Sequence, residues 1–237
     1  MINIPYTQDA ATHHLIFWVM VVVALLFGRV PYISAPFRWM EVFFHEISHG
    51  LATVLTGGKV HVIKLMFYGA GACVSSGGSR FFILISGYSG AVLWGSAIYL
   101  MGTFTGHHQA AQDIMFVLLL FLMISTVLWV RDLATLVIMI FMALVFWIPN
   151  RYPAVPGLEY LLQFMGIFIT ISAIKAPLDL IDGKHEGDGA ELANMLLIPE
   201  GVWILLWFAM GLAALAYMWQ IPLPPQERIL DFLPFLS

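Results

Sequence analysis

Long apolar runs separated by short polar or Gly/Pro-containing breaks dominate this chain. A helix needs about 20 predominantly apolar residues to cross a bilayer, and about seven runs approach that length. They cover residues 14–33, 38–55, 81–101, 114–130, 133–148, 158–174 and 202–219. The pattern predicts an all-α polytopic membrane protein with about seven transmembrane helices. No repeat or long linker divides the chain, so we expect a single domain over residues 1–237.

One helix boundary must be inferred from charge alone. Residues 114–148 are too long for a single span, yet they contain no Gly or Pro. Arg131 and Asp132 interrupt this run, and two charges held inside one membrane helix would cost on the order of a few kcal/mol. We therefore predict a tight interfacial turn at this pair.

A different pattern fills residues 57–76, which follow the second apolar run. Gly57 and Gly58 open the segment, and polar and apolar residues then alternate before a stretch rich in Gly, Ala and Ser. Such alternation beside turn residues is typical of short β-strands. We expect a small β-rich insertion here, between the second span and residues 81–219, which hold the later spans.

Composition supports a membrane protein and excludes some functions. The chain is 61% hydrophobic and 10% charged, with a mean hydropathy of +0.90, whereas soluble domains carry about 25% charged residues. A net charge of -4 leaves no basic stripe that could neutralise a phosphate backbone, so we expect no nucleic-acid partner. Cys73 is the single cysteine, which excludes an internal disulfide and a multi-cysteine zinc cage.

The second span contains the pattern H-E-x-x-H as His45-Glu46-Ile47-Ser48-His49. On a helix, His45 and His49 lie one turn apart on the same face and can both reach one Zn²⁺, with Glu46 beside them to polarise a water molecule. Ionisable residues inside an apolar span are costly unless they face a cavity, a metal or one another. A pair of core histidines with Glu46 as their counter-charge is the structural alternative.

Several carboxylates could complete or support this site. A catalytic zinc needs a third protein ligand and an open position, and the acidic segment after the sixth span offers Asp179, Asp182 and Asp188. Each could instead be a solvated interfacial charge. Glu41 precedes His45 by one turn, but its place near the start of the second span favours interaction with the helix dipole.

The ordered set of motifs resembles the site-2 proteases, in the compact branch found in bacteria and plants. The matching segments are Phe44 to Ala52, Leu55 to Val60, Gly77 to Arg80, Ser86 to Gly90 and Ile198 to Trp203, together with the acidic segment. This resemblance implies an intramembrane zinc endopeptidase with one Zn²⁺ per chain.

The resemblance also implies residue roles. His45, His49 and one aspartate would bind zinc, and Glu46 would act as general base. Asp188 precedes Gly189 at the start of a helical stretch and reproduces the family's aspartate-glycine pattern best, so we rank it ahead of Asp182 and Asp179. The latter two could instead orient the histidines.

The expected partners are the lipid bilayer and a membrane protein substrate with a transmembrane helix, and the expected location is the plasma (inner) membrane. Part of the substrate must unwind, and an edge strand from Lys59 to Phe67 could hold the extended form by β-addition. Two alternatives are a non-catalytic membrane protein that binds or transports metal ions and an inactive relative of the proteases.

Overall fold

The computed structural model describes residues 9–104, 108–151, 157–181 and 185–221. Its elements are α1 (Asp9–Phe27), α2 (Pro31–Leu55), β1 (Lys59–Leu65), β2 (Gly71–Ser76), α3 (Arg80–Phe104), α4 (His108–Trp129), α5 (Leu133–Arg151), α6 (Leu158–Lys175), a 3-10 helix (Ala176–Leu180), α7 (Asp188–Leu196) and α8 (Glu200–Gln220). The predicted all-α architecture with a small β insertion after the second helix is confirmed.

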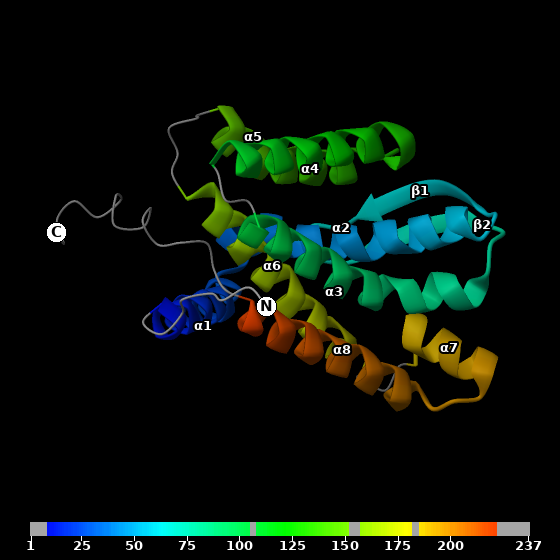
Figure 1. Cartoon of the computed structure of the whole chain (residues 1–237). Coiled ribbons are helices and arrows are strands. Elements are labelled where there is room, and N and C mark those ends of the chain that lie inside the picture. Colours follow the sequence, from blue (N-terminus) through cyan, green and yellow to red (C-terminus); the bar gives the residue numbers. More distant parts are fainter. Residues whose placement is uncertain (1–8, 105–107, 152–156, 182–184, 222–237) are drawn as a thin grey trace.

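The helices form a bundle in which α6 is the most enclosed member. Helix α6 contacts α1, α2, α3, α4 and α8, and the α4–α5 pair lies along one side of the bundle (Figure 1). The β hairpin and α7 both lie at the end where α3 begins (Figure 1). Segments far apart in the sequence therefore meet at this end of the bundle.

Helices α3 and α6 pack backbone against backbone. A Cβ atom added to Gly166 of α6 would lie 2.5 Å from the backbone nitrogen of Tyr99 and 2.6 Å from the carbonyl oxygen of Gly95, both on α3. Small residues allow such close approach in membrane helices, where dispersion contacts drive association. This contact fixes α3 on α6.

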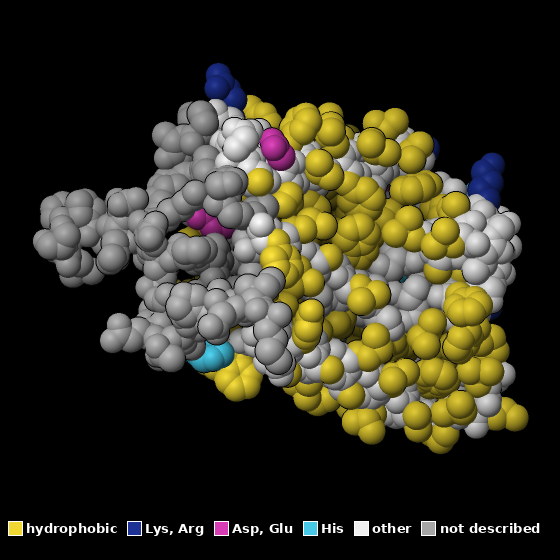
Figure 2. Space-filling model, in the orientation of Figure 1, with side chains coloured by type: hydrophobic (Ala, Val, Ile, Leu, Met, Phe, Trp, Pro, Cys, Tyr) yellow, Lys and Arg dark blue, Asp and Glu magenta, His cyan; other side chains and the backbone are white. Residues whose placement is uncertain are grey.

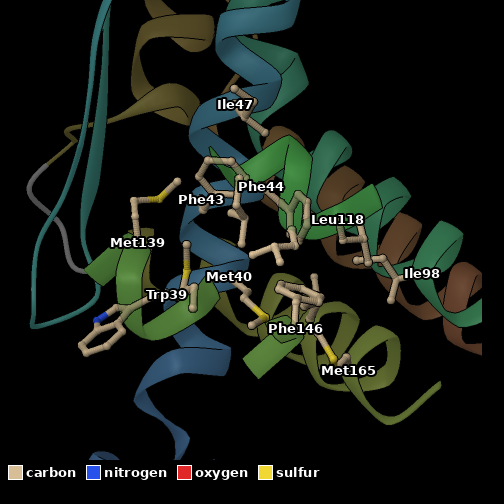
Figure 3. Close-up of a cluster of buried hydrophobic side chains, with 14 of the residues drawn as sticks. Trp39, Met40, Phe43, Phe44, Ile47, Ile98, Leu118, Met139, Phe146 and Met165 are labelled. Carbon is tan, nitrogen blue, oxygen red and sulfur yellow. The ribbon is translucent and has the colours of Figure 1, made fainter. Parts of the chain in front are cut away.

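Helix α2 buries an apolar stripe against the α4–α5 pair. Met40, Phe43, Phe44 and Ile47 follow the spacing i, i+3, i+4, i+7 and join one buried cluster with residues of α4, α5 and α6 (Figure 3). A helix has a period of 3.6 residues, so residues 41, 45 and 49 lie on a different face. The packing of the apolar stripe thus directs the polar positions of α2 away from α4 and α5.

Five described helices are each long and apolar enough to cross a membrane, namely α3, α4, α5, α6 and α8. Residues His14–Phe27 and Pro31–Leu55 meet the same criterion only as a pair, bent by 110°. The predicted count of seven spans is therefore approximate, although every predicted span corresponds to a helix. Apolar side chains cover much of the outer surface (Figure 2), as expected for an integral membrane protein.

The predicted turn at Arg131 and Asp132 is confirmed, because α4 ends before the pair and α5 begins after it. The Asp132 carboxylate accepts hydrogen bonds from the backbone N–H and the hydroxyl of Thr135, at 2.9 and 2.8 Å. These bonds lower the pKa of Asp132, and they satisfy a free donor in the first turn of α5. The Thr135 hydroxyl oxygen also accepts from the backbone N–H of Leu65 at 3.0 Å, which ties β1 to α5.

The predicted β-rich insertion is an antiparallel hairpin. Lys59 of β1 pairs with Ser76 of β2, and Leu65 pairs with Gly71, with one irregularity between Val60 and Val62. Both strands contact α2. The hairpin therefore lies against the helix that carries the H-E-x-x-H motif.

Candidate metal centre

The two histidines of α2 converge as their spacing predicts. The Nε2 atoms of His45 and His49 are 2.9 Å apart, and the rings meet edge to face with centroids separated by 4.6 Å. Both rings project from the face of α2 that the apolar stripe leaves free. One helical turn thus supplies two imidazole nitrogens to a single point.

Asp188 brings a carboxylate to the same point from the first residue of α7. Its Oδ2 atom lies 3.2 Å from Nε2 of His45 and 3.2 Å from Nε2 of His49. Burial by itself would raise the pKa of Asp188, but its close contacts with both histidines lower the pKa below the ordinary value. The three residues form a group that could hold a metal ion.

The geometry of this triangle fits zinc. Zinc binds nitrogen and oxygen ligands at about 2.0–2.2 Å in tetrahedral geometry, so two ligand atoms on one ion lie about 3.3 Å apart. The three separations here are 2.9, 3.2 and 3.2 Å. Two imidazoles and one carboxylate leave the fourth tetrahedral position open, as catalytic zinc sites require.

A backbone contact orients one of the imidazoles. Nδ1 of His49 lies 2.6 Å from the carbonyl oxygen of Ile83 on α3. A carbonyl oxygen only accepts, so Nδ1 carries the proton and the Nε2 lone pair is free to bind a metal ion. This arrangement is the one that metal-binding histidines use.

Of the other two aspartates only Asp179 is among the described residues, and it does not join this group. Asp179 is exposed in the 3-10 helix and lines a second cavity of about 270 Å³ with Arg38 and Lys175. No hydrogen bond joins it to either histidine among the residues that the structure describes. Asp182 lies outside the described residues.

A cavity of about 420 Å³ opens beside the three converging side chains. Glu46 lines it and is only 6% exposed. A Cβ atom added to Gly71 of β2 would lie 2.6 Å from Oε1 of Glu46, so the backbone of this strand passes directly over the carboxylate. Glu46, both histidines and Asp188 thus line one cavity.

The strand beside this cavity differs from the expected one. Residues Gly71 to Cys73 of β2 line the cavity, and no residue of β1 does; β1 instead contacts α4 and α5. The cavity lining therefore favours β2 over Lys59 to Phe67 as the strand nearest to an extended substrate. A peptide lying in the cavity would meet β2.

The assignment of Glu41 to a first turn is also wrong. Helix α2 begins at Pro31, so Glu41 lies in its interior, where it is 7% exposed and lines the cavity. The predicted second span begins at Arg38, because this charged residue precedes the apolar run. The helix extends further because Pro31 occupies its first turn, where proline is tolerated.

Gly87 of α3 is a site residue that sequence reasoning did not single out, although it lies within the matching segment Ser86 to Gly90. A Cβ atom at this position would lie 2.5 Å from Cε1 of His49 and 2.6 Å from Cε1 of His45. Glycine therefore lets α3 close over both rings. The signal available in the sequence was the spacing of small residues at i and i+4, Ser86 with Gly90 and Gly87 with Ala91, which suits close helix packing. A Cβ atom added to Gly90 would likewise meet α2, at Ser48.

Replacing Gly87 by Ala should lower the affinity for zinc at least about tenfold, as loss of a supporting contact does at other metal sites. The added methyl group would displace both imidazole rings from the positions in which their Nε2 atoms converge. Gly201→Ala is the matched control, because a Cβ atom there meets no atom within 4 Å. Zinc titration of the two purified variants measures the effect, and equal affinities would contradict the contact.

Comparison with known families gives one match. A family model described as Peptidase M50B-like matches residues 18–218, a range that contains the H-E-x-x-H motif and Asp188. No curated protein and no solved structure matches this chain.

Proposed function

Because the chain belongs to the Peptidase M50B-like family, within the site-2 proteases that its motifs resemble, we propose that it is an intramembrane zinc endopeptidase. Its substrates would be membrane proteins, cut within or near a transmembrane helix. Its place would be the plasma (inner) membrane. The observation that carries this proposal is the convergence of His45, His49 and Asp188 beside Glu46 in one cavity.

The ligand residues have the first role in this chemistry. His45, His49 and Asp188 would hold the ion, with Ile83 and Gly87 fixing the rings. When bound, zinc would polarise the scissile carbonyl group and make a water molecule more acidic. The apolar residues packed behind α2 keep the surroundings at low dielectric, which strengthens such interactions.

Glu46 would move the proton. Its carboxylate accepts a proton from the attacking water, whose oxygen forms the new bond to the carbonyl carbon. It then donates that proton to the amide nitrogen as the carbon–nitrogen bond breaks, so the products are a carboxylic acid and an amine. Burial within the cavity keeps Glu46 beside the reacting atoms.

The substrate must present an extended backbone to the cavity, because a helix hides its peptide bonds within its own hydrogen bonds. Residues Gly71 to Cys73 offer a strand beside Glu46. An unwound substrate segment could add to β2 as a further strand, with its scissile bond near Glu46.

Removal of the metal tests the proposed function. The protein, purified and reconstituted in lipid vesicles, should contain one zinc per chain and cleave some members of a panel of single-span membrane proteins. A chelator should abolish cleavage, and added Zn²⁺ should restore it. Metal analysis and gel-based cleavage assays measure both.

Two results would contradict the proposal. Cleavage that survives complete removal of metal would exclude a zinc peptidase. Zinc flux across the vesicle membrane without cleavage of any panel member would favour the metal-transport alternative.

A further inference from the structure

Tyr88 follows Gly87 on α3 and lies between two aromatic rings. Its ring meets His45 edge to face with centroids 4.5 Å apart, and it packs against Trp207 of α8 at 4.7 Å. Trp207 is fully buried, and its indole N–H lies 3.4 Å from the Ile85 carbonyl oxygen. The two contacts hold the Tyr88 ring against a candidate metal ligand.

The hydroxyl of Tyr88 differs in its hydrogen bonding from the other hydroxyls around the site. Ser48, Thr53 and Ser86 donate to backbone carbonyl oxygens of their own helices, at 2.6, 2.8 and 2.7 Å. Tyr88 lines the cavity, and its hydroxyl forms no hydrogen bond with any residue that the structure describes. The Tyr88 hydroxyl is therefore free to donate a hydrogen bond in the same cavity that Glu46 lines.

Few side chains that line this cavity could donate a hydrogen bond to a substrate. Apart from the two histidines, they are Cys73, Arg80 and Tyr88. Arg80 is paired with Glu191 of α7 and is largely exposed, and a thiol is a weak donor. Tyr88 is thus the one strong uncommitted donor among the described residues that line the cavity.

Peptide hydrolysis needs such a donor. As water adds to the scissile carbonyl carbon, negative charge develops on the carbonyl oxygen, and a positioned donor in a water-poor site stabilises that charge. The aromatic contacts with His45 and Trp207 fix the Tyr88 ring beforehand, so little reorganisation is needed during the reaction.

We propose that Tyr88 is a further catalytic residue, whose hydroxyl donates a hydrogen bond to the oxyanion formed on the scissile carbonyl oxygen. The phenol keeps its proton throughout, and the proton transfers remain those of Glu46. This inference rests on the proposed peptidase function.

Tyr88→Phe tests the role because it removes the hydroxyl and keeps the ring on His45 and Trp207. We expect kcat to fall about a hundredfold, as when one oxyanion donor is removed, with KM within about twofold and zinc content unchanged. Tyr99→Phe is the matched control, since Tyr99 lies on the same helix, is fully buried against α1 and does not line the cavity. It should keep the wild-type kcat.

A second measurement separates catalysis from packing. A phosphonamidate peptide with the sequence of a cleaved substrate mimics the tetrahedral oxyanion. The phosphonamidate should bind Tyr88→Phe about a hundredfold more weakly than it binds the wild-type protein. The substrate itself should bind equally well to the inactive variant Glu46→Gln and to the double variant that carries both Glu46→Gln and Tyr88→Phe. Wild-type kcat in Tyr88→Phe, or an effect on KM alone, would overturn the role of Tyr88 and leave the peptidase proposal intact. A wild-type protein that binds zinc but cleaves no member of the substrate panel would overturn both.

Discussion

Glu46→Gln should keep one zinc per chain and lose proteolysis on the order of 10³-fold, a typical value for loss of a general base. This loss equals about 4 kcal/mol of transition-state stabilisation. Glutamine has nearly the same size as glutamate, so the buried position beside Gly71 stays filled. An amide cannot accept the proton from water, and thus only the chemical step should fail. Metal analysis and single-turnover cleavage measure the two properties separately.

Glu159→Gln is the control for this substitution. Glu159 is a buried carboxylate at the start of α6 and does not line the cavity, so the same chemical change there should leave cleavage intact. Glu46→Gln protein that retains wild-type turnover would exclude Glu46 as the base. Loss of zinc in Glu46→Gln would instead show that Glu46 is needed for metal binding.

Replacing any one of His45, His49 or Asp188 by Ala should remove zinc, with affinity falling by orders of magnitude and activity lost in parallel. Three protein ligands are the minimum for a catalytic zinc site, and the described residues around the triangle offer no further metal-binding group within reach. Equilibrium dialysis against buffered Zn²⁺ measures the affinity. Stoichiometric zinc in both histidine variants would refute the site.

The neighbouring aspartates provide a graded comparison. Asp179→Ala should keep stoichiometric zinc, because this carboxylate lines the second cavity. Asp182→Ala should lower the affinity about ten- to a hundredfold if that residue orients a histidine. The assignment of Asp188 fails if Asp182→Ala empties the site while Asp188→Ala keeps full zinc.

Local sequence patterns predicted most of the helices and one turn. Apolar runs identify helices because a helix must be long enough to cross the lipid. Helix α5 begins directly after Asp132, whose carboxylate accepts a hydrogen bond from the backbone N–H of Thr135 in the first turn. Alternation after Gly57 and Gly58 predicted the hairpin. The pairing of His45 with His49 was predictable for the same reason, since one helical turn separates them whatever the rest of the chain does.

Only the tertiary structure decided which distant groups meet this helix. Asp179 and Asp188 both belong to the acidic segment after α6, and packing of α7 beside α3 brings Asp188, but not Asp179, to the histidines. Packing of α3 on α2 placed Gly87 and Tyr88 against the imidazole rings. The apolar stripe of α2 buried against α4 and α5 left Glu41 facing the cavity. Periodicity acts over a few residues of one segment, whereas these contacts depend on which helix surfaces fit one another closely enough to exclude lipid.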